Sequence, residues 1–287
     1  MLTAEAPIGA PAPEAVMARA HSENFPVASR ALPPRVRSHL LAVYGFARLL
    51  DELGDSAPGD RLVALDWLEG ELDRAFRGDA EHPLLVRLQE TLKECSLARE
   101  PFARLIEANR VDQRVKRYET WAQLRGYCEL SADPVGELVL GVFGLATPAR
   151  IRLSNSICTA LQLTEHCQDV AEDLARGRVY LPREDLRRFG CADAELAGAH
   201  AGGPLRDVIA FEVARARGLL AEGGPLIGEV RGRTRLAVAA FVAGGRAALD
   251  AIERAGYDVL PGPPPVRRRR RALALVATLA GRGRRVS

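Results

Sequence analysis

Apolar residues recur at helical spacing along nearly the whole chain, and this periodicity constrains the fold most strongly. From Pro34 to Asp55 and from Asp60 to Arg77, leucine, valine and aromatic side chains return every three or four residues. That repeat is typical of helices that bury one face or more. We see no β alternation, no fixed-period repeat and no linker that divides the chain. The pattern predicts one all-α domain, built as a helical bundle.

Composition narrows the class of protein. The 287 residues are 47% hydrophobic, enough for a substantial core, and contain neither an 18-residue apolar run nor the basic, apolar start of a signal peptide. Five cysteines without a Cys-x-x-Cys pair favour reduced thiols, so we expect a cytoplasmic protein. The 40 basic residues are nearly all arginine, which binds phosphate bidentately, although a compositional bias is the simpler explanation.

Two pairs of aspartates carry the chemistry. Asp51 and Asp55 form one pair, Asp169 and Asp173 the other, and each pair follows an apolar helical stretch. Four residues make about one helical turn, so both carboxylates of a pair lie on one face and repel each other. The negative end of the helix dipole adds to this cost. Solvated helix-end acids are the simple alternative, but the repetition favours a function.

A divalent cation would resolve this repulsion. Mg²⁺ takes oxygen ligands and commonly binds through one or two carboxylates together with substrate phosphates. Two such faces, opposed across a hydrophobic cavity, would hold a diphosphate and stabilise it as a leaving group. Arg48 precedes the first pair and Arg178 follows the second, where they can bind phosphate.

Four segments resemble the squalene and phytoene synthase family, whose members join prenyl diphosphates head to head. The resemblance runs from about His21 to Tyr257. The segments that carry it are His21-Ser-Glu-Asn-Phe25, Tyr44-Gly-Phe-Ala-Arg48 continuing to Asp55, Tyr127-Cys-Glu-Leu-Ser-Ala-Asp-Pro-Val-Gly136, and Leu161 to Asp173 followed by Gly177-Arg-Val-Tyr-Leu-Pro182.

The resemblance implies an isoprenoid-synthase-type bundle around a central hydrophobic cavity. It places a flexible N-terminus at 1–13, a catalytic domain at 14–260 and a Pro/Arg-rich tail at 261–287. It also implies site residues by position: Mg²⁺ on Asp51, Asp55, Asp169 and Asp173; diphosphate or cavity contacts from Ser22, Tyr44, Arg48, Gln162, Gln168 and Arg178; and catalysis by Tyr127 with Asp51 and Asp169. Tyr127 would handle a proton or stabilise a cation.

Two departures from the family pattern bear on the substrate. The usual Asn-x-x-Arg-Asp is Glu165-His-Cys-Gln168-Asp169 here, which makes the second pair more negative by two charges. With glutamine at position 168, the motif resembles that of the hydroxysqualene synthases of hopanoid pathways. Those enzymes act on presqualene diphosphate made by a sister synthase. A separate reductase then uses their product. We therefore expect a lyase that converts presqualene diphosphate to hydroxysqualene with Mg²⁺ and without NADPH.

Two alternatives remain open. Within the family, the chain could be a transferase that condenses two farnesyl diphosphates to presqualene diphosphate or squalene. In a different class, it could be a non-catalytic helical scaffold, which the changes at Glu165 and Gln168 allow.

The C-terminal tail combines charge with apolar residues. Arg267 to Arg271 precede the apolar stretch Ala272–Ala280, which is too short to span a bilayer but can lie on anionic lipid. A solvated tail is the alternative. Without interleaved aromatics or a nucleic-acid motif, we expect no nucleic-acid partner. Peripheral contact with the inner face of the membrane is thus one expectation.

Overall fold

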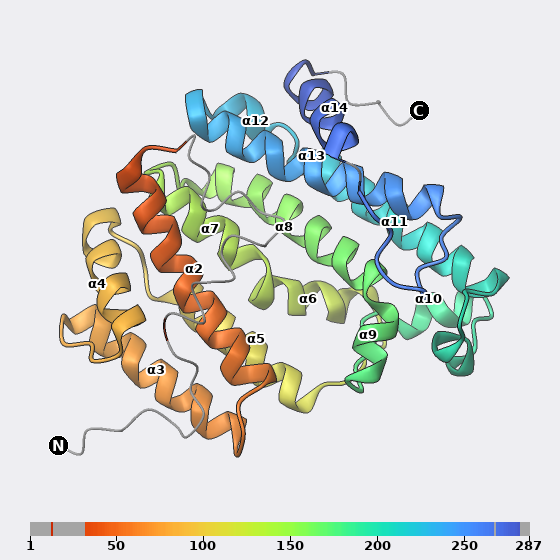
Figure 1. Cartoon of the computed structure of the whole chain (residues 1–287), viewed down its shortest axis with the longest axis horizontal. Coiled ribbons are helices and arrows are strands. Elements are labelled where there is room, and N and C mark those ends of the chain that lie inside the picture. The colour runs from red at the N-terminus through yellow and green to blue at the C-terminus, as the bar shows by residue number, and fades with distance from the viewer. Residues whose placement is uncertain (1–12, 14–31, 267, 282–287) are drawn as a thin grey trace. The chain divides into compact units, whose positions relative to one another are not determined.

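The computed structural model describes residues 13, 32–266 and 268–281 (Figure 1). Within them the chain is helical, and its strand-like pairing is an isolated parallel bridge between Arg117 and Val179. The all-α class is therefore confirmed. The helices are α2 (Pro34–Asp55), α3 (Arg61–Arg77), α4 (Pro83–Cys95), α5 (Glu100–Arg114), α6 (Trp121–Ser131), α7 (Asp133–Val142), α8 (Pro148–Gln168), α9 (Val170–Ala175), α10 (Arg183–Arg188), the 3₁₀ helix η3 (Asp193–Ala197), α11 (Gly203–Gly223), α12 (Leu226–Glu229), α13 (Gly232–Arg254) and α14 (Arg268–Leu279).

Local signals explain where these helices begin and end. The Asp60 side chain accepts hydrogen bonds from the backbone N–H groups of Leu62 and Val63, which caps the start of α3. Gly78 ends the same helix with a φ of 92°, a conformation that glycine adopts without strain. Thr120 caps α6 by accepting a hydrogen bond on its side-chain oxygen from the backbone N–H of Gln123. The helical run is interrupted between α6 and α7, just before Pro134, because a proline disfavours the helical conformation in the residues that precede it.

Internal contacts divide the described helices into two compact units. The first contains the described chain up to Arg114 together with Pro134–Thr147; the second contains Val115–Asp133 and the described chain from Pro148 onward. The single domain expected at 14–260 and its central cavity stay predictions. The tail expected at 261–287 contains α14, which begins inside the arginine run, before the predicted apolar stretch.

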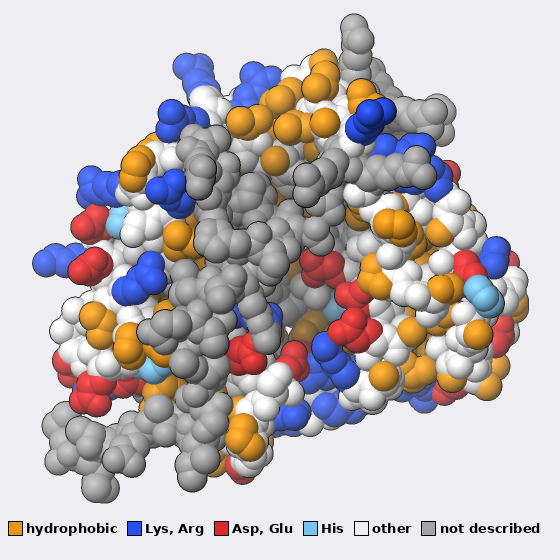
Figure 2. All heavy atoms as spheres, in the orientation of Figure 1, with side chains coloured by type: hydrophobic (Ala, Val, Ile, Leu, Met, Phe, Trp, Pro, Cys, Tyr) orange, Lys and Arg blue, Asp and Glu red, His pale blue; other side chains and the backbone are white. Residues whose placement is uncertain are grey.

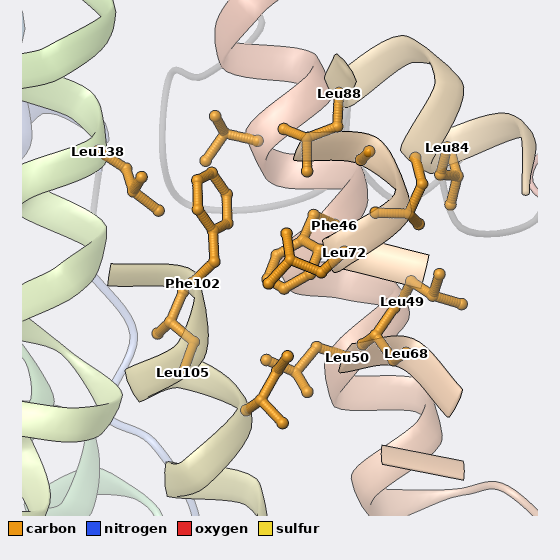
Figure 3. Packing of buried hydrophobic residues seen from close by; sticks show 14 of the residues in the cluster. Phe46, Leu49, Leu50, Leu68, Leu72, Leu84, Leu88, Phe102, Leu105 and Leu138 are labelled. Carbon is orange, nitrogen blue, oxygen red and sulfur yellow. The ribbon is translucent and has the colours of Figure 1, made fainter. Parts of the chain in front are cut away.

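The first unit has a leucine-rich core. Phe46 of α2 meets Phe102 of α5 edge to face, with ring centroids 5.1 Å apart and ring planes at 90°. Both rings are fully buried. Figure 3 shows α2, α3, α4, α5 and α7 each contributing to this cluster, which includes Leu49, Leu50, Leu68, Leu72, Leu84, Leu88, Leu105 and Leu138. The core fixes the axis of α2, whose last turn carries Asp51 and Asp55.

In the second unit, α8 and α11 pack along their length. Gly223 on α11 lies so close to α8 that an added Cβ would fall 2.6 Å from the carbonyl oxygen of Leu153. A buried ion pair ties α6 to the same assembly: Asp133, 1% exposed, accepts hydrogen bonds from Arg125 at 3.0 Å and from the Thr159 hydroxyl at 2.9 Å. Burial raises the pKa of Asp133, while Arg125 opposes that rise. These contacts hold Tyr127, on α6, against α8.

Candidate functional site

The first aspartate pair lies on the last turn of α2, and both carboxylates are exposed. Arg48, one turn earlier, donates from Nη2 to Glu52 Oε1 at 2.9 Å, and its Nη1 lies 3.9 Å from Asp51 Oδ2. The Nε of Arg48 is buried, with no hydrogen-bond partner among the described residues. An exposed carboxylate pair beside an arginine with an unused donor fits a cation together with a bound anion.

The glycine inside this motif has a packing role. Gly54 faces α5, where the Gln113 side chain donates to the Gly54 carbonyl oxygen at 3.0 Å. A Cβ at position 54 would lie 2.0 Å from the Asn109 amide oxygen. The missing side chain lets α5 approach the turn that carries Asp51 and Asp55. Tyr44, two and a half turns earlier on α2, is half-buried.

The second pair lies at a break between two helices. Asp169 separates α8 from α9 with φ −104° and ψ 18°, outside the helical region. The helical hydrogen bonds nevertheless continue across it: Asp169 donates its N–H to the Glu165 carbonyl at 2.9 Å, and Asp173 donates to the Asp169 carbonyl at 2.8 Å. The four-residue spacing predicts a helical turn through this pair, with no break at Asp169. The break therefore lies at Asp169 itself, one of the residues expected to bind metal.

Negative charge accumulates at this break. Burial, together with the charges of Asp173 and Glu172, raises the pKa of Asp169 to about 6. Glu172 pairs with Arg176 at 2.7 Å, and His166 Nδ1 lies 3.9 Å from Asp173 Oδ2. A half-buried carboxylate that resists ionisation beside another carboxylate is the setting in which a divalent cation lowers the energy most.

The remaining predicted residues of the second unit lie close by. The Gln162 side-chain nitrogen is 3.3 Å from His166 Nε2 on the same helix. Arg178 is 8% exposed, and its backbone N–H donates to the Asp173 carbonyl at 2.9 Å. Gln168 is half-buried and Glu165 exposed. Ser22 lies outside the described residues.

An aromatic cluster surrounds Tyr127, which is 7% exposed. Its ring centroid lies 5.5 Å from those of Tyr118 and Tyr180, and 6.3 Å from that of His166. His166 stacks on Tyr180 at 3.9 Å with planes 13° apart. The faces of such rings carry negative potential and attract cations.

The sequence pattern predicts no role for Tyr118, Tyr180 or His166. The parallel bridge explains how two of them meet: Val179 donates its N–H to the Lys116 carbonyl at 2.9 Å, and Arg183 donates to the Tyr118 carbonyl at 3.0 Å. This pairing places Tyr118 beside Tyr180. A two-residue contact between distant loops leaves no periodic signal, so only the β-favouring composition of Arg178–Leu181 hinted at it.

The two aspartate pairs offer carboxylate oxygens as possible metal ligands. Among the described residues, three or more His, Cys, Asp or Glu side chains nowhere gather closely enough to hold an ion by themselves. Each aspartate pair supplies two carboxylates, so an Mg²⁺ ion held there would need water or oxygens of a bound anion to complete its coordination. The residues that would hold the ion are Asp51 and Asp55 in the first unit, and Asp169 and Asp173 in the second.

Comparison with known proteins places this geometry in a family. The squalene/phytoene synthase family model matches residues 18–271. The hydroxysqualene synthase of Sinorhizobium fredii is 36% identical over 213 residues, which cover 73% of this chain and 72% of the relative. The phytoene synthase of Arthrospira platensis is 33% identical over 258 residues, covering 83% and 82%. The crystal structure of a squalene synthase from Alicyclobacillus acidocaldarius superposes with a TM-score of 0.80 at 48% identity, covering 85% of this chain and 94% of that one.

Proposed function

Because the chain belongs to the squalene/phytoene synthase family, we propose that it converts presqualene diphosphate to hydroxysqualene, with loss of diphosphate, in squalene and hopanoid biosynthesis. Family membership makes it an enzyme of the squalene, phytoene or hydroxysqualene synthase type that acts on prenyl diphosphates. The particular step is our proposal. The observation that carries it is Gln168, which stands next to Asp169 where the family pattern has arginine.

The two aspartate pairs support a magnesium-dependent reaction. In each unit, the proposed role of the pair is to hold an ion that neutralises diphosphate as it leaves. Arg48 lies beside Asp51, and its buried Nε has no hydrogen-bond partner among the described residues, so Arg48 is the proposed phosphate ligand of the first unit. The raised pKa of Asp169 supports a cation as the natural partner of that carboxylate, since ionisation without one is costly.

The aromatic cluster supports a carbocation intermediate. Loss of diphosphate from a cyclopropylcarbinyl substrate leaves a carbon cation, which then rearranges and is trapped by water at one carbon, with a proton released from that water. The proposed role of Tyr127 is to stabilise the cation with its ring, or to relay this proton through its hydroxyl to the departing diphosphate. Tyr180 and His166 hold that ring in place by stacking within the same cluster.

The main alternative is condensation of two farnesyl diphosphates. The chain is also similar to a phytoene synthase and a squalene synthase, which supports this alternative. The absence of the family's arginine at position 168 weighs against it, because condensation must hold two diphosphates at once, whereas presqualene diphosphate carries one. A non-catalytic scaffold would gain nothing from two repelling aspartate pairs, and both are intact.

The test offers the purified protein either presqualene diphosphate or farnesyl diphosphate, with and without Mg²⁺ and NADPH. We expect hydroxysqualene from presqualene diphosphate alone, only with Mg²⁺, and independent of NADPH. Efficient turnover of farnesyl diphosphate would replace this step by condensation. Absence of magnesium-dependent binding of inorganic diphosphate would favour the scaffold.

A further inference from the structure

Charge is distributed very unevenly along the chain. Residues 231–287 contain thirteen arginines and three acidic residues, a net charge of +10. The whole chain carries +3, so the preceding residues carry −7. This asymmetry concentrates positive charge on the C-terminal part of the chain, which contains eight of these arginines in α13 and α14. A segment so charged is expected to seek an anionic partner.

The last helix is fixed to the second unit by its inner face. Helix α14 packs against α13, and Figure 1 shows the two in contact. Thr278 is buried and accepts a hydrogen bond from Arg246 Nη1 at 3.1 Å. Arg235 Nη2 donates to the Leu279 carbonyl oxygen at 3.3 Å, which satisfies a group at the end of the helix. The helix therefore presents one defined face outward.

The outward face of α14 is apolar beside arginine. Leu273 is 69% exposed and Val276 65% exposed, three residues apart on one side of the helix. Arg269, four residues before Leu273, continues the same stripe, and Arg270 is also exposed. Figure 2 shows hydrophobic side chains gathered with Lys or Arg side chains along the upper edge of the view, over α13 and α14. We call Arg269, Arg270, Leu273 and Val276 the α14 face.

We propose that the α14 face docks the protein on the surface of an anionic phospholipid bilayer. Its arginines would bind lipid phosphates, while Leu273 and Val276 would enter the boundary between headgroups and acyl chains. The helix would lie along the surface, since no helix among the described residues is long and apolar enough to cross a membrane. The inference rests on charge and exposure alone and is independent of the reaction proposed above.

Lipid fits this face better than the other anionic or apolar partners. A nucleic acid would use the arginines but would gain nothing from exposed aliphatic side chains, and the face offers no aromatic ring for stacking. A second copy of the chain would bring Arg269 and Arg270 toward their own equivalents, which repel. An anionic bilayer can contact both the two arginines and the two aliphatic side chains of the α14 face favourably.

The experiment measures binding of the full chain to vesicles by flotation. One set contains phosphatidylcholine alone; the other contains phosphatidylglycerol and phosphatidylcholine in equal amounts. We expect at least about tenfold stronger binding to the anionic set, weakened by salt. Leu273→Glu with Val276→Glu should reduce that binding about tenfold or more, as should Arg269→Glu with Arg270→Glu.

A matched control tests whether any added acid has this effect. Val63 on α3 is 60% exposed and Arg87 on α4 is exposed, so Val63→Glu with Arg87→Glu makes similar changes far from α14 along the chain. This variant should bind anionic vesicles within about twofold of the parent protein. Circular dichroism confirms that each variant is folded.

Three outcomes would overturn the proposal. The first is equal binding to neutral and anionic vesicles. The second is unchanged binding by folded variants of the α14 face. The third is a different occupant: tighter binding of a single-stranded oligonucleotide than of vesicles, or a dimer in sedimentation that Leu273→Glu with Val276→Glu converts to a monomer.

Discussion

Gly54 and Asn109 lie so close that a methyl group added to Gly54 would fall 2.0 Å from the Asn109 amide oxygen. This contact joins α5 to the turn of α2 that carries the first aspartate pair. The Gly54→Ala change should therefore destabilise the fold by about 1–2 kcal/mol, despite the higher helix propensity of alanine. Urea unfolding measures the change.

The same contact predicts a reversal of sign. In an Asn109→Ala background the clashing oxygen is absent, so Gly54→Ala should stabilise the protein by up to about 1 kcal/mol through helix propensity. Equal effects of Gly54→Ala in both backgrounds would show that the two residues are not coupled.

Asp51→Asn and Asp169→Asn should each lower turnover by a factor of about a hundred or more, because each removes one proposed ligand of a cation that stabilises the leaving group. Helix content by circular dichroism should not change. The control is Glu90→Gln, an exposed acid on α4, which should keep full activity. Retained activity in both aspartate variants would refute metal binding at the pairs.

Asp169→Asn should also make the metal-free protein more stable. The folded-state pKa of Asp169 is raised to about 6. The free energy of unfolding therefore falls as pH rises from the usual carboxyl range through 6, where Asp169 becomes ionised at a cost in stability. Above that range the asparagine avoids the cost, which we put at about 1 kcal/mol because solvent screens a half-buried group. Urea unfolding in chelator at pH 7.5 tests this. Lower stability of Asp169→Asn would contradict the repulsion.

Two substitutions separate the possible roles of Tyr127. Tyr127→Phe keeps the ring and loses the hydroxyl; Tyr127→Leu loses both. If the ring stabilises a cation, the phenylalanine variant should keep most of the turnover, while the leucine variant loses about tenfold or more. Equal loss in both variants would assign the role to the hydroxyl. Single-turnover rates measure the chemical step in each case.

Glu212 predicts a second pH effect, away from the aspartate pairs. Burial, helped by Asp185, raises its pKa to about 8, against the pull of Arg215, whose Nη1 lies 2.5 Å from Glu212 Oε1 and 3.0 Å from Asp185 Oδ2. With one guanidinium between two carboxyls, a protonated Glu212 leaves the cluster neutral. The folded state thus holds a proton that the unfolded state has lost above about pH 4.5, so stability falls as pH rises toward 8.

Between pH 6.5 and 8 the ionisation of Glu212 should lower the free energy of unfolding of the parent protein by up to about 1.4 kcal/mol per pH unit. Glu212→Gln should remove this contribution, so its free energy of unfolding should depend less on pH. The control is Glu222→Gln, an exposed residue of the same helix α11, which should keep the pH dependence of the parent. A Glu212→Gln profile parallel to the parent would show that Glu212 is ionised throughout.

Helix boundaries were predictable because their signals are local. The segment Pro34–Asp55 begins at a proline and Arg61–Arg77 ends at a glycine, and both helices have the predicted ends. The aspartate pairs were predictable for the same reason, since four-residue spacing is read from the chain itself.

Features that depend on distant segments were not predictable. The bridge that brings Tyr118 to Tyr180 joins loops about sixty residues apart, as its Arg117–Val179 partners show. The break at Asp169 sits within a helical periodicity that gives no sign of it. The burial of Glu212 was not predictable either, because a glutamate in an apolar helix is expected to be solvated until its partners Arg215 and Asp185 are known.

The path of the chain through its two units has a consequence for synthesis on the ribosome. Leu138 and Val142 of α7 complete the core of the first unit, yet 115–133, which belong to the second, are translated before them. A nascent chain that ends near Arg114 therefore exposes the apolar surface that α7 will cover. The first unit can complete its core only after residues 115–133 of the second unit have been translated, so a chain halted there exposes apolar surface that chaperones bind.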